Sequence, residues 1–133
     1  MIEPGVRIIG NVTLGEGVSI AAPAEVMAKD SSIVIGDGCD IAAFVTISTA
    51  DSSRRCTGRA LEIERRPIVI GSRVFIGTGA VILGGCEIGD HSVIGAGVVL
   101  KGVKIPPNSR VMPMGPPRGG RSSLARPGFA RST

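Results

Sequence analysis

Tryptophan and tyrosine are absent from this chain of 133 residues, and phenylalanine occurs only three times. A hydrophobic core must therefore be built from Ile, Val, Leu and Ala, because 43% of the residues are hydrophobic but only 2% are aromatic. Twenty glycines and nine prolines are too many for packed helices, whereas the Ile and Val content is too high for a disordered chain. One domain of short strands joined by tight turns fits this composition best.

Metal ligands and targeting segments are also scarce. The chain has one histidine, and its three cysteines (Cys39, Cys56 and Cys86) lack metal-ligand spacing and leave at least one thiol unpaired, as in a reducing compartment. No charged segment leads into an apolar stretch at the start, and no apolar run approaches the roughly 18 residues of a membrane span. We therefore expect a cytoplasmic protein without membrane insertion.

Acidic residues are missing from the end of the chain, where residues 115–133 contain four arginines: Arg118, Arg121, Arg126 and Arg131. The net charge of +4 belongs to this tail, since the remaining body is neutral. Its Pro and Gly content favours a disordered tail over a nucleic-acid-binding arm, and ordering on a neighbouring subunit is a further alternative. We predict a domain of residues 1–114, a basic tail of residues 115–133, and no nucleic acid partner.

The second half of the chain carries a repeat of six residues. From Ile70 it reads IGSRVF, IGTGAV, ILGGCE, IGDHSV, IGAGVV and LKGVKI, so an aliphatic residue opens each of six consecutive hexads. The fifth position is small or slim, and Val103 takes this role one place early in the last hexad. Neither a helical period of about 3.6 residues nor simple alternation describes the pattern. Two earlier blocks with the same interval are separated by a slip of three residues: Ile8, Leu14, Ile20, and then Ile35, Ile41, Ile47.

Such hexads predict an all-β solenoid in which each hexad forms a short parallel strand and a bend that favours Gly, Asn or Asp. Three hexads close one triangular coil, so residues eighteen apart lie over one another at about 4.8 Å, the spacing of paired strands. Pro106 and Pro107 cannot donate hydrogen bonds to a strand ladder, so we expect them to end the solenoid. The expected stacked pairs are Ile70 with Ile88, Ile76 with Ile94, and Ile82 with Leu100.

The hexads resemble the left-handed parallel β-helix of the hexapeptide-repeat acyltransferases, from residue 6 to about residue 118. The stretch RRPIVIGSRVFIGTGAVILGGCEIGDHSVIGAGVVLKGVKIPPNSRV and the ending MGPPR resemble the maltose, galactoside and polysaccharide-sugar O-acetyltransferases in particular. This resemblance implies a homotrimer with acetyl-CoA bound in clefts between adjacent prisms. It also implies an excursion loop, which here spans residues 51–66.

The single histidine, His91, lies in the bend of the hexad IGDHSV. Because His adopts the left-handed backbone conformation more readily than most residues, a turn role explains it. The alternatives are catalysis and a ring of three such histidines that holds an ion on a trimer axis. A carbonic anhydrase relative of the same fold needs three histidines for zinc, so we expect no metal.

In the resembling acetyltransferases, a catalytic histidine follows a Thr-Ala pair and one variable residue at the start of the excursion loop. Thr49 and Ala50 match that pattern, but the histidine position falls on Ser52, which cannot take a proton from a sugar hydroxyl near neutral pH. Asp51 either replaces the base, with a pKa raised in an intersubunit cleft, or starts the turn into the loop. Asp51 and Ser52 are therefore the candidate catalytic positions, while Cys56 lacks an adjacent base for a nucleophilic role.

Four small residues in the hexads that begin at Ile76 and Ile94 resemble the family segments that line the pantetheine groove: Thr78, Gly79, Ala96 and Gly97. A simple bend role explains the glycines equally well. Lys101 matches a family lysine near the phosphates of CoA, and Arg118 matches a basic residue shortly after the final Gly and Pro. Solvated surface positions explain both charges equally well.

The resemblance implies an acetyl-CoA-dependent acetyltransferase that acts on a sugar hydroxyl or amine by direct transfer in a ternary complex. The short N-terminus lacks the extra helical segment of the free-sugar enzymes, which favours surface polysaccharide biosynthesis. The five arginines in residues 51–66 favour an anionic nucleotide-linked or lipid-linked acceptor. The alternative is a catalytically impaired trimer that binds CoA, a sugar or a protein partner.

Overall fold

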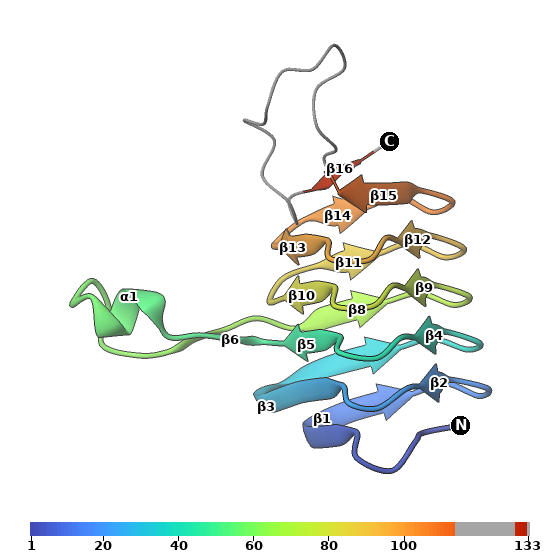
Figure 1. Ribbon diagram of the computed structural model, residues 1–133. Helices are drawn as coiled ribbons and strands as arrows, with labels where there is room; N and C mark the ends of the chain where they lie inside the picture. The colour runs from blue at the N-terminus through green and yellow to red at the C-terminus, as the bar shows by residue number, and fades with distance from the viewer. Residues whose placement is uncertain (114–129, 133) are drawn as a thin grey trace.

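The computed structural model describes residues 1–113 and 130–132 and is a parallel β-solenoid of stacked coils (Figure 1). Within the described residues, one short helix interrupts the strands, α1 (Ser53–Cys56). The strands are β1 (Arg7–Leu14), β2 (Ser19–Ile20), β3 (Glu25–Ile35), β4 (Asp40–Ile41), β5 (Thr46–Ser48), β6 (Ala50–Asp51), β7 (Glu64–Arg65), β8 (Ile68–Ile70), β9 (Phe75–Ile76), β10 (Val81–Leu83), β11 (Glu87–Ile88), β12 (Val93–Ile94), β13 (Val99–Lys101), β14 (Lys104–Ile105), β15 (Arg110–Pro113) and β16 (Ala130–Ser132).

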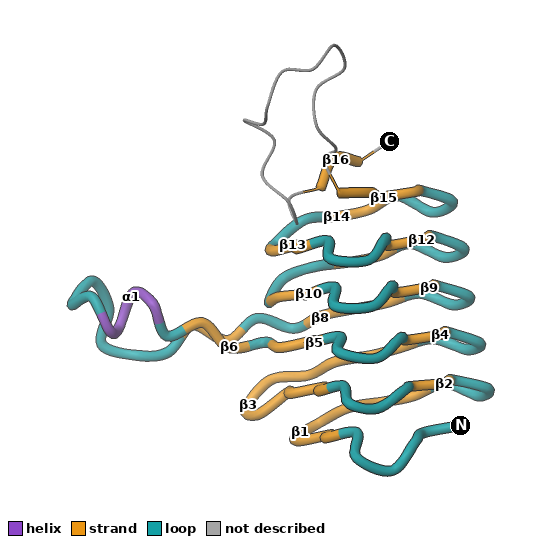
Figure 2. The backbone as a smooth tube through the Cα atoms, in the orientation of Figure 1, coloured by secondary structure: helices purple, strands orange, loops and turns teal. Residues whose placement is uncertain are grey.

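The strands stack in three rows, which form the faces of the prism (Figure 2). One row follows the order β15, β12, β9, β4 and β2, with β16 antiparallel on β15. The other two rows belong to one sheet of order β13, β10, β5, β3, β8, β11 and β14, because β3 turns a corner. The first part of β3 pairs with β5 and its last part pairs with β8.

The register confirms the predicted stacking of residues eighteen apart. Ile88 pairs with Ile70, Ile94 with Ile76, and Leu100 with Ile82, and all six side chains are buried. The ladder continues downwards through the second block, where Ile35, Ile41 and Ile47 pair with Ile70, Ile76 and Ile82 respectively. The core is therefore a column of aliphatic side chains with the all-β architecture that the hexads predict.

The first and last coils depart from the regular pattern. Ile8 is 39% exposed because β1 has only β3 as a neighbour. The slip of three residues is a bulge in β3, since Gly10 pairs with Ala28 but Asn11 pairs with Ser32.

At the other end of the solenoid, the last coil is one residue shorter, because Ile105 pairs with Ile88 after only seventeen residues. Val103 takes the fifth position one place early, as predicted, since the Glu87 amide donates to its carbonyl as the Val69 amide donates to that of Cys86, although the Val103 side chain is 38% exposed. One prediction is wrong. Pro106 and Pro107 lie in a corner rather than at the end of the solenoid, because β15 follows them and pairs with β12.

The bend role of His91 is confirmed. His91 has a φ of +60°, in the left-handed region, and its side chain is exposed. Polar groups link the stacked bends of this corner: the Ser72 amide donates to Asp90 Oδ1 at 2.8 Å, the Asp37 amide to Ser72 Oγ at 3.2 Å, and the Glu16 amide to Asp37 Oδ1 at 2.8 Å. These bonds satisfy backbone donors that the parallel ladder leaves unpaired.

The predicted excursion loop is present and leaves the solenoid between β5 and β8 (Figures 1 and 2). We call residues 50–66 the arm: β6 pairs antiparallel with β7, and α1 lies beyond this ribbon. Most of the predicted basic tail, including Arg118, lies outside the described residues, so its disorder stays a prediction. No helix in the described part of the chain is long and apolar enough to cross a membrane.

Candidate functional site

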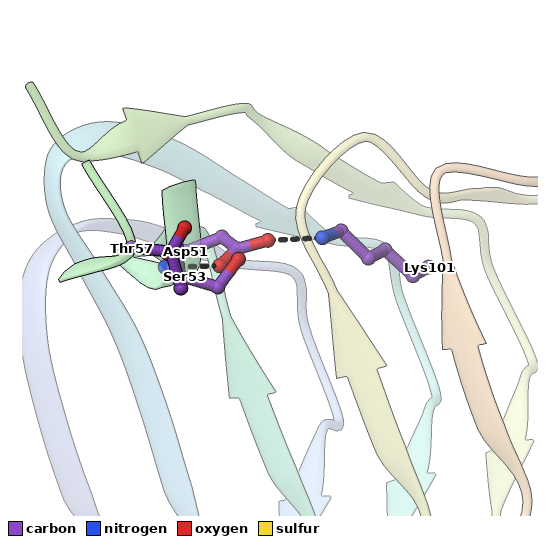
Figure 3. Close-up of polar contacts among 4 residues, drawn as sticks. All are labelled: Asp51, Ser53, Thr57 and Lys101. Atoms are coloured by element: carbon purple, nitrogen blue, oxygen red, sulfur yellow. Dashed lines mark hydrogen bonds and ion pairs between the residues drawn. The ribbon is translucent and has the colours of Figure 1, made fainter. Parts of the chain in front are cut away.

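The root of the arm is fastened to the solenoid by an ion pair. Lys101, at the end of β13, donates from Nζ to Asp51 Oδ2, although the two residues are fifty positions apart (Figure 3). The Ser53 amide donates to Asp51 Oδ1 at 2.8 Å, which places the carboxylate at the turn into α1. The two candidate residues Asp51 and Lys101 therefore meet each other in the folded chain.

The electrostatics of this pair oppose one expectation. The hydrogen bond from Lys101, followed by those from Ser53, holds the pKa of Asp51 well below its ordinary value. The replacement-base hypothesis expects a raised pKa through burial, but the Asp51 side chain is only partly buried, with 26% of its surface exposed. In this arrangement Asp51 acts as a turn residue and an ion-pair partner and is a weak proton acceptor.

Ser52 is exposed and immediately precedes α1. Its carbonyl accepts the Cys56 amide at 2.8 Å, while its hydroxyl makes no capping hydrogen bond to the helix. The Thr57 hydroxyl donates to the Ser53 carbonyl at 2.8 Å and closes the helical turn (Figure 3). Ser52 is therefore held by the backbone of α1 with its side chain open to solvent.

Two arginines hold the returning side of the arm, and no pattern in the sequence distinguishes them from the other arginines of residues 51–66. Arg65 donates from Nη1 to the Lys29 carbonyl at 3.0 Å and lies 3.9 Å from Asp30 Oδ2 through Nε. The guanidinium of Arg66 packs on Gly85, where an added Cβ would lie 2.5 Å from Arg66 Cζ. Because the end of the arginine side chain can shift, it is the left-handed φ of +86° at Gly85 that favours glycine at this corner.

The four small candidate residues do come together, on the corner at the opposite end of β10 and β13. Thr78 and Gly79 form one bend and Ala96 and Gly97 the bend above it, joined by a hydrogen bond from the Gly97 amide to the Thr78 carbonyl at 3.0 Å. Gly79 and Gly97 have φ values of +74° and +72°, and an added Cβ would meet nothing within 4 Å at either position. This column of bends presents bare backbone to the outside.

The bend column and Lys101 lie at the two ends of one sheet face, because β13 runs from just after Gly97 to Lys101. Val81, Leu83 and Val99 lie outward on this face and are partly or largely exposed. This sheet face suits a thin, partly apolar ligand with an anionic group at the Lys101 end. To bind Lys101, the anionic group must displace the carboxylate of Asp51. Among the described residues, no cluster of three or more His, Cys, Asp or Glu side chains is suited to a metal ion.

A third bend in the same column contains an exposed aromatic residue that was not among the predicted site residues. Phe44 has a φ of +63°, its ring is 64% exposed, and the Ala43 carbonyl beside it accepts the Gly79 amide at 3.1 Å. A signal for it exists in the sequence. The fourth position of the hexads carries the left-handed residue, and the hexad IAAFVT has Phe at the position where IGTGAV and IGAGVV have Gly.

Comparison with known proteins identifies the hexad repeat and proteins that are similar to part of this chain. Residues 67–102 match the model of the bacterial transferase hexapeptide (six repeats). The galactoside O-acetyltransferase of Escherichia coli (strain K12) is 41% identical over 87 residues, which cover 59% of this chain and 39% of that protein. This chain thus spans about two fifths of the length of the curated relative that it matches.

Solved structures agree with this similarity. A hexapeptide-repeat acetyltransferase of Vibrio cholerae superimposes with a TM-score of 0.76 and 27% identity, over 99% of this chain and 68% of that chain. A galactoside acetyltransferase in complex with coenzyme A superimposes with a TM-score of 0.72 and 34% identity, over 83% of this chain and 56% of that chain. The stacked hexads, their register and these similarities lead to one conclusion: the chain contains a hexapeptide-repeat region at residues 67–102 and is similar to galactoside O-acetyltransferase over part of that protein's length.

Proposed function

We propose that the protein is an acetyltransferase that transfers the acetyl group of acetyl-CoA to a sugar hydroxyl or amine. The observation that carries this proposal is the bend column of Thr78, Gly79, Ala96 and Gly97, with Lys101 at the far end of the same face. The similar galactoside acetyltransferase was solved with coenzyme A, which supports CoA as the ligand of this proposal.

The chain's own residues supply the binding groups that such a ligand needs. The open Cβ directions of Gly79 and Gly97 let an extended pantetheine arm approach the backbone closely. The ammonium of Lys101 and the guanidinium of Arg118 attract phosphate groups, and Arg118 lies beyond the described residues. An arriving phosphate has to displace the Asp51 carboxylate from Lys101, so binding of the nucleotide part and release of the arm root are coupled.

The acceptor is proposed from the family and from the charge of the arm. Arg54, Arg55 and Arg59 are exposed and favour an anionic acceptor such as a nucleotide-linked sugar. We place the reaction in cytoplasmic synthesis of surface polysaccharide and the enzyme in a homotrimer, in which the arm of one protomer reaches a neighbour. Analytical ultracentrifugation tests this assembly directly, since a monomer at micromolar concentration contradicts it.

A second candidate function is a binding module without catalysis, and two observations favour it specifically. The position that carries the family's catalytic histidine holds Ser52, and the neighbouring carboxylate of Asp51 has a lowered pKa. Proton removal from a sugar hydroxyl needs a base that titrates near the working pH. If no other group supplies that base, the protein retains CoA binding and loses transfer.

One set of measurements separates the two functions. Release of the CoA thiol from acetyl-CoA is followed over a panel of sugars and nucleotide sugars, with CoA binding measured in parallel by calorimetry. Turnover that Asp51→Asn abolishes supports an enzyme with a replacement base. Binding without turnover supports the binding module, and a gain of activity in Ser52→His but not in the matched variant Ser53→His then identifies a degraded catalytic site. Absence of both binding and turnover contradicts both functions.

A further inference from the structure

Arg66 lies at the corner where the arm rejoins the solenoid, and its side chain follows that corner towards the C-terminal coils. Its amide donates to the Thr49 carbonyl at 3.0 Å, which fixes the start of the side chain. A Cβ added at Gly85 would lie 2.5 Å from Arg66 Cζ, and a Cβ added at Gly102 would lie 3.1 Å from Arg66 Nη1. The guanidinium therefore rests against the backbone of the next two coils, at two corners where the chain has glycine.

The donors of the Arg66 guanidinium are not used within the described part of the chain, since no hydrogen bond or ion pair there involves its N–H groups. The neighbouring Arg65, in contrast, donates to the Lys29 carbonyl and lies 3.9 Å from Asp30 Oδ2. A guanidinium presents its donors in a planar fork that matches a phosphate group. Arg66 is therefore a positioned cation whose donors are open to an anion.

A second cation belongs to the same corner. Gly102 directly follows Lys101, whose ammonium is held by the Asp51 carboxylate (Figure 3). Glu64 is paired with Asp51 in the β6–β7 ribbon, but it forms no ion pair with Arg66 or Lys101. The contact between Asp51 and Lys101 shows that an anionic oxygen is favourable here, and Arg66 adds a cation without such a contact. The corner therefore attracts a further anion.

Packing of an arginine on a glycine does not by itself mark such a site. Arg73 makes the same kind of contact, since a Cβ added at Gly38 would lie 2.9 Å from Arg73 Cδ. Its corner, however, carries the carboxylates of Asp37 and Asp90, which accept backbone amides of the stacked bends. These carboxylates repel an anion that approaches Arg73. The two corners therefore differ in charge, and only the corner of Arg66 favours an anionic ligand.

We propose that Arg66 and Lys101 bind the diphosphate group of a nucleotide, with Arg66 free to bind first and Lys101 joining once a phosphate displaces Asp51. A diphosphate suits this corner because it carries two linked anionic groups, one for each cation. This group occurs in both substrates of the proposed reaction, in CoA and in a nucleotide-linked sugar. The inference rests on the proposed function, because it takes such nucleotides as ligands. It deepens that function by adding Arg66, which lies outside the positions that the resemblance implies.

Calorimetry with CoA and with UDP-glucose tests this site in Arg66→Gln, which removes the charge and the fork. Loss of the charge-assisted contact should weaken binding about tenfold or more for the nucleotide whose diphosphate occupies the corner. A loss for CoA assigns the corner to the donor and a loss for UDP-glucose assigns it to the acceptor, and either result supports the site. Arg66→Lys keeps the charge and should lose less affinity. Lys101→Met should weaken binding of the same nucleotide as Arg66→Gln.

The matched control is Arg73→Gln, which makes the same charge change at another arginine that packs on a glycine and should leave both affinities unchanged. Unchanged binding of both nucleotides in Arg66→Gln, or an equal loss in Arg73→Gln, overturns the inference and leaves the proposed function standing. Losses for different nucleotides in Arg66→Gln and Lys101→Met overturn the shared site. Equal losses in Arg66→Gln and Arg66→Lys with a lower melting temperature also overturn it, because they would reveal a packing role. Failure of the wild type to bind either nucleotide overturns the proposed function and this inference together.

Discussion

Replacing Ile76 by alanine tests whether the aliphatic ladder holds the solenoid together. Ile76 is fully buried, and its strand pairs on both sides, with Ile41 below and Ile94 above. The substitution removes three carbon atoms, which corresponds to a transfer free energy of about 2.4 kcal/mol at about 0.8 kcal/mol for each methylene. The flanking coils are hydrogen-bonded in place and cannot collapse into the space, so we expect a total loss of about 4 kcal/mol, within the range of about 2 to 5 kcal/mol for such changes.

The measurement is urea unfolding followed by far-UV circular dichroism, at one fixed protein concentration because assembly adds to apparent stability. Ile8→Ala is the matched control: Ile8 also lies on an inward row, opposite Val26, but it is 39% exposed at the open first coil. Its expected loss is about 1.5 kcal/mol, the transfer free energy scaled to the buried part with little cavity left behind. Equal losses at the two positions would refute the idea that stability comes from stacking between neighbouring coils.

Three further predictions concern the arm and the thiols. Lys101→Met should speed tryptic cleavage of the arm by at most about fivefold, because an exposed ion pair contributes modestly to stability; unchanged cleavage would mean that the pair does not hold the arm. In the wild type this protection should persist on acidification to well below pH 4, because a carboxylate whose folded-state pKa is lowered loses its contact only when the pH falls through that value; loss of protection near pH 4 would contradict the lowered pKa of Asp51. Ellman's reagent should label one thiol of the native protein rapidly, the exposed Cys56, while Cys39 and Cys86 react only on unfolding. Fast labelling of two or more thiols at neutral pH would contradict the burial of Cys39 and Cys86. Burial also raises the pKa of the Cys39 thiol. The stabilising contribution of this thiol is therefore complete below the ordinary thiol pKa and is lost as the pH rises through the folded-state value.

The solenoid was predictable because its repeat lies in the sequence itself. An aliphatic residue every six positions predicts a solenoid, and with three hexads to a coil it predicts the observed pairing of Ile70 with Ile88. Local irregularities were less visible. The three extra residues in β3 appear in the sequence as a slip in the six-residue period. The period does not specify where in the strand the bulge lies, and the structure places it directly after Ala28. The missing residue before Ile105 moves Val103 one place early into the fifth position, where its side chain stays 38% exposed.

The candidate site was less predictable, because it depends on contacts between distant coils. The small residues of the bend column follow from the hexad register, and they do stack as the resemblance implies. The pairing of Lys101 with Asp51 depends on the path of the arm, which no periodicity specifies, and it reversed the pKa shift expected for Asp51. The hexad register does mark Phe44, because it places an aromatic residue at a fourth position, where the left-handed conformation favours Gly, but it does not indicate what the ring contacts.

The way in which the arm leaves and rejoins the solenoid has a consequence for how such proteins diversify. Ile47 before the arm pairs with Ile82 after it, in the same register as any other two consecutive coils. The register of the stacked strands is therefore maintained across the insertion between β5 and β8, although Asp51 and Arg65 of the arm contact the solenoid. Substitutions, deletions or insertions between β5 and β8 can therefore change the catalytic activity while the stacked coils remain folded. The activity and the fold of such proteins can evolve independently.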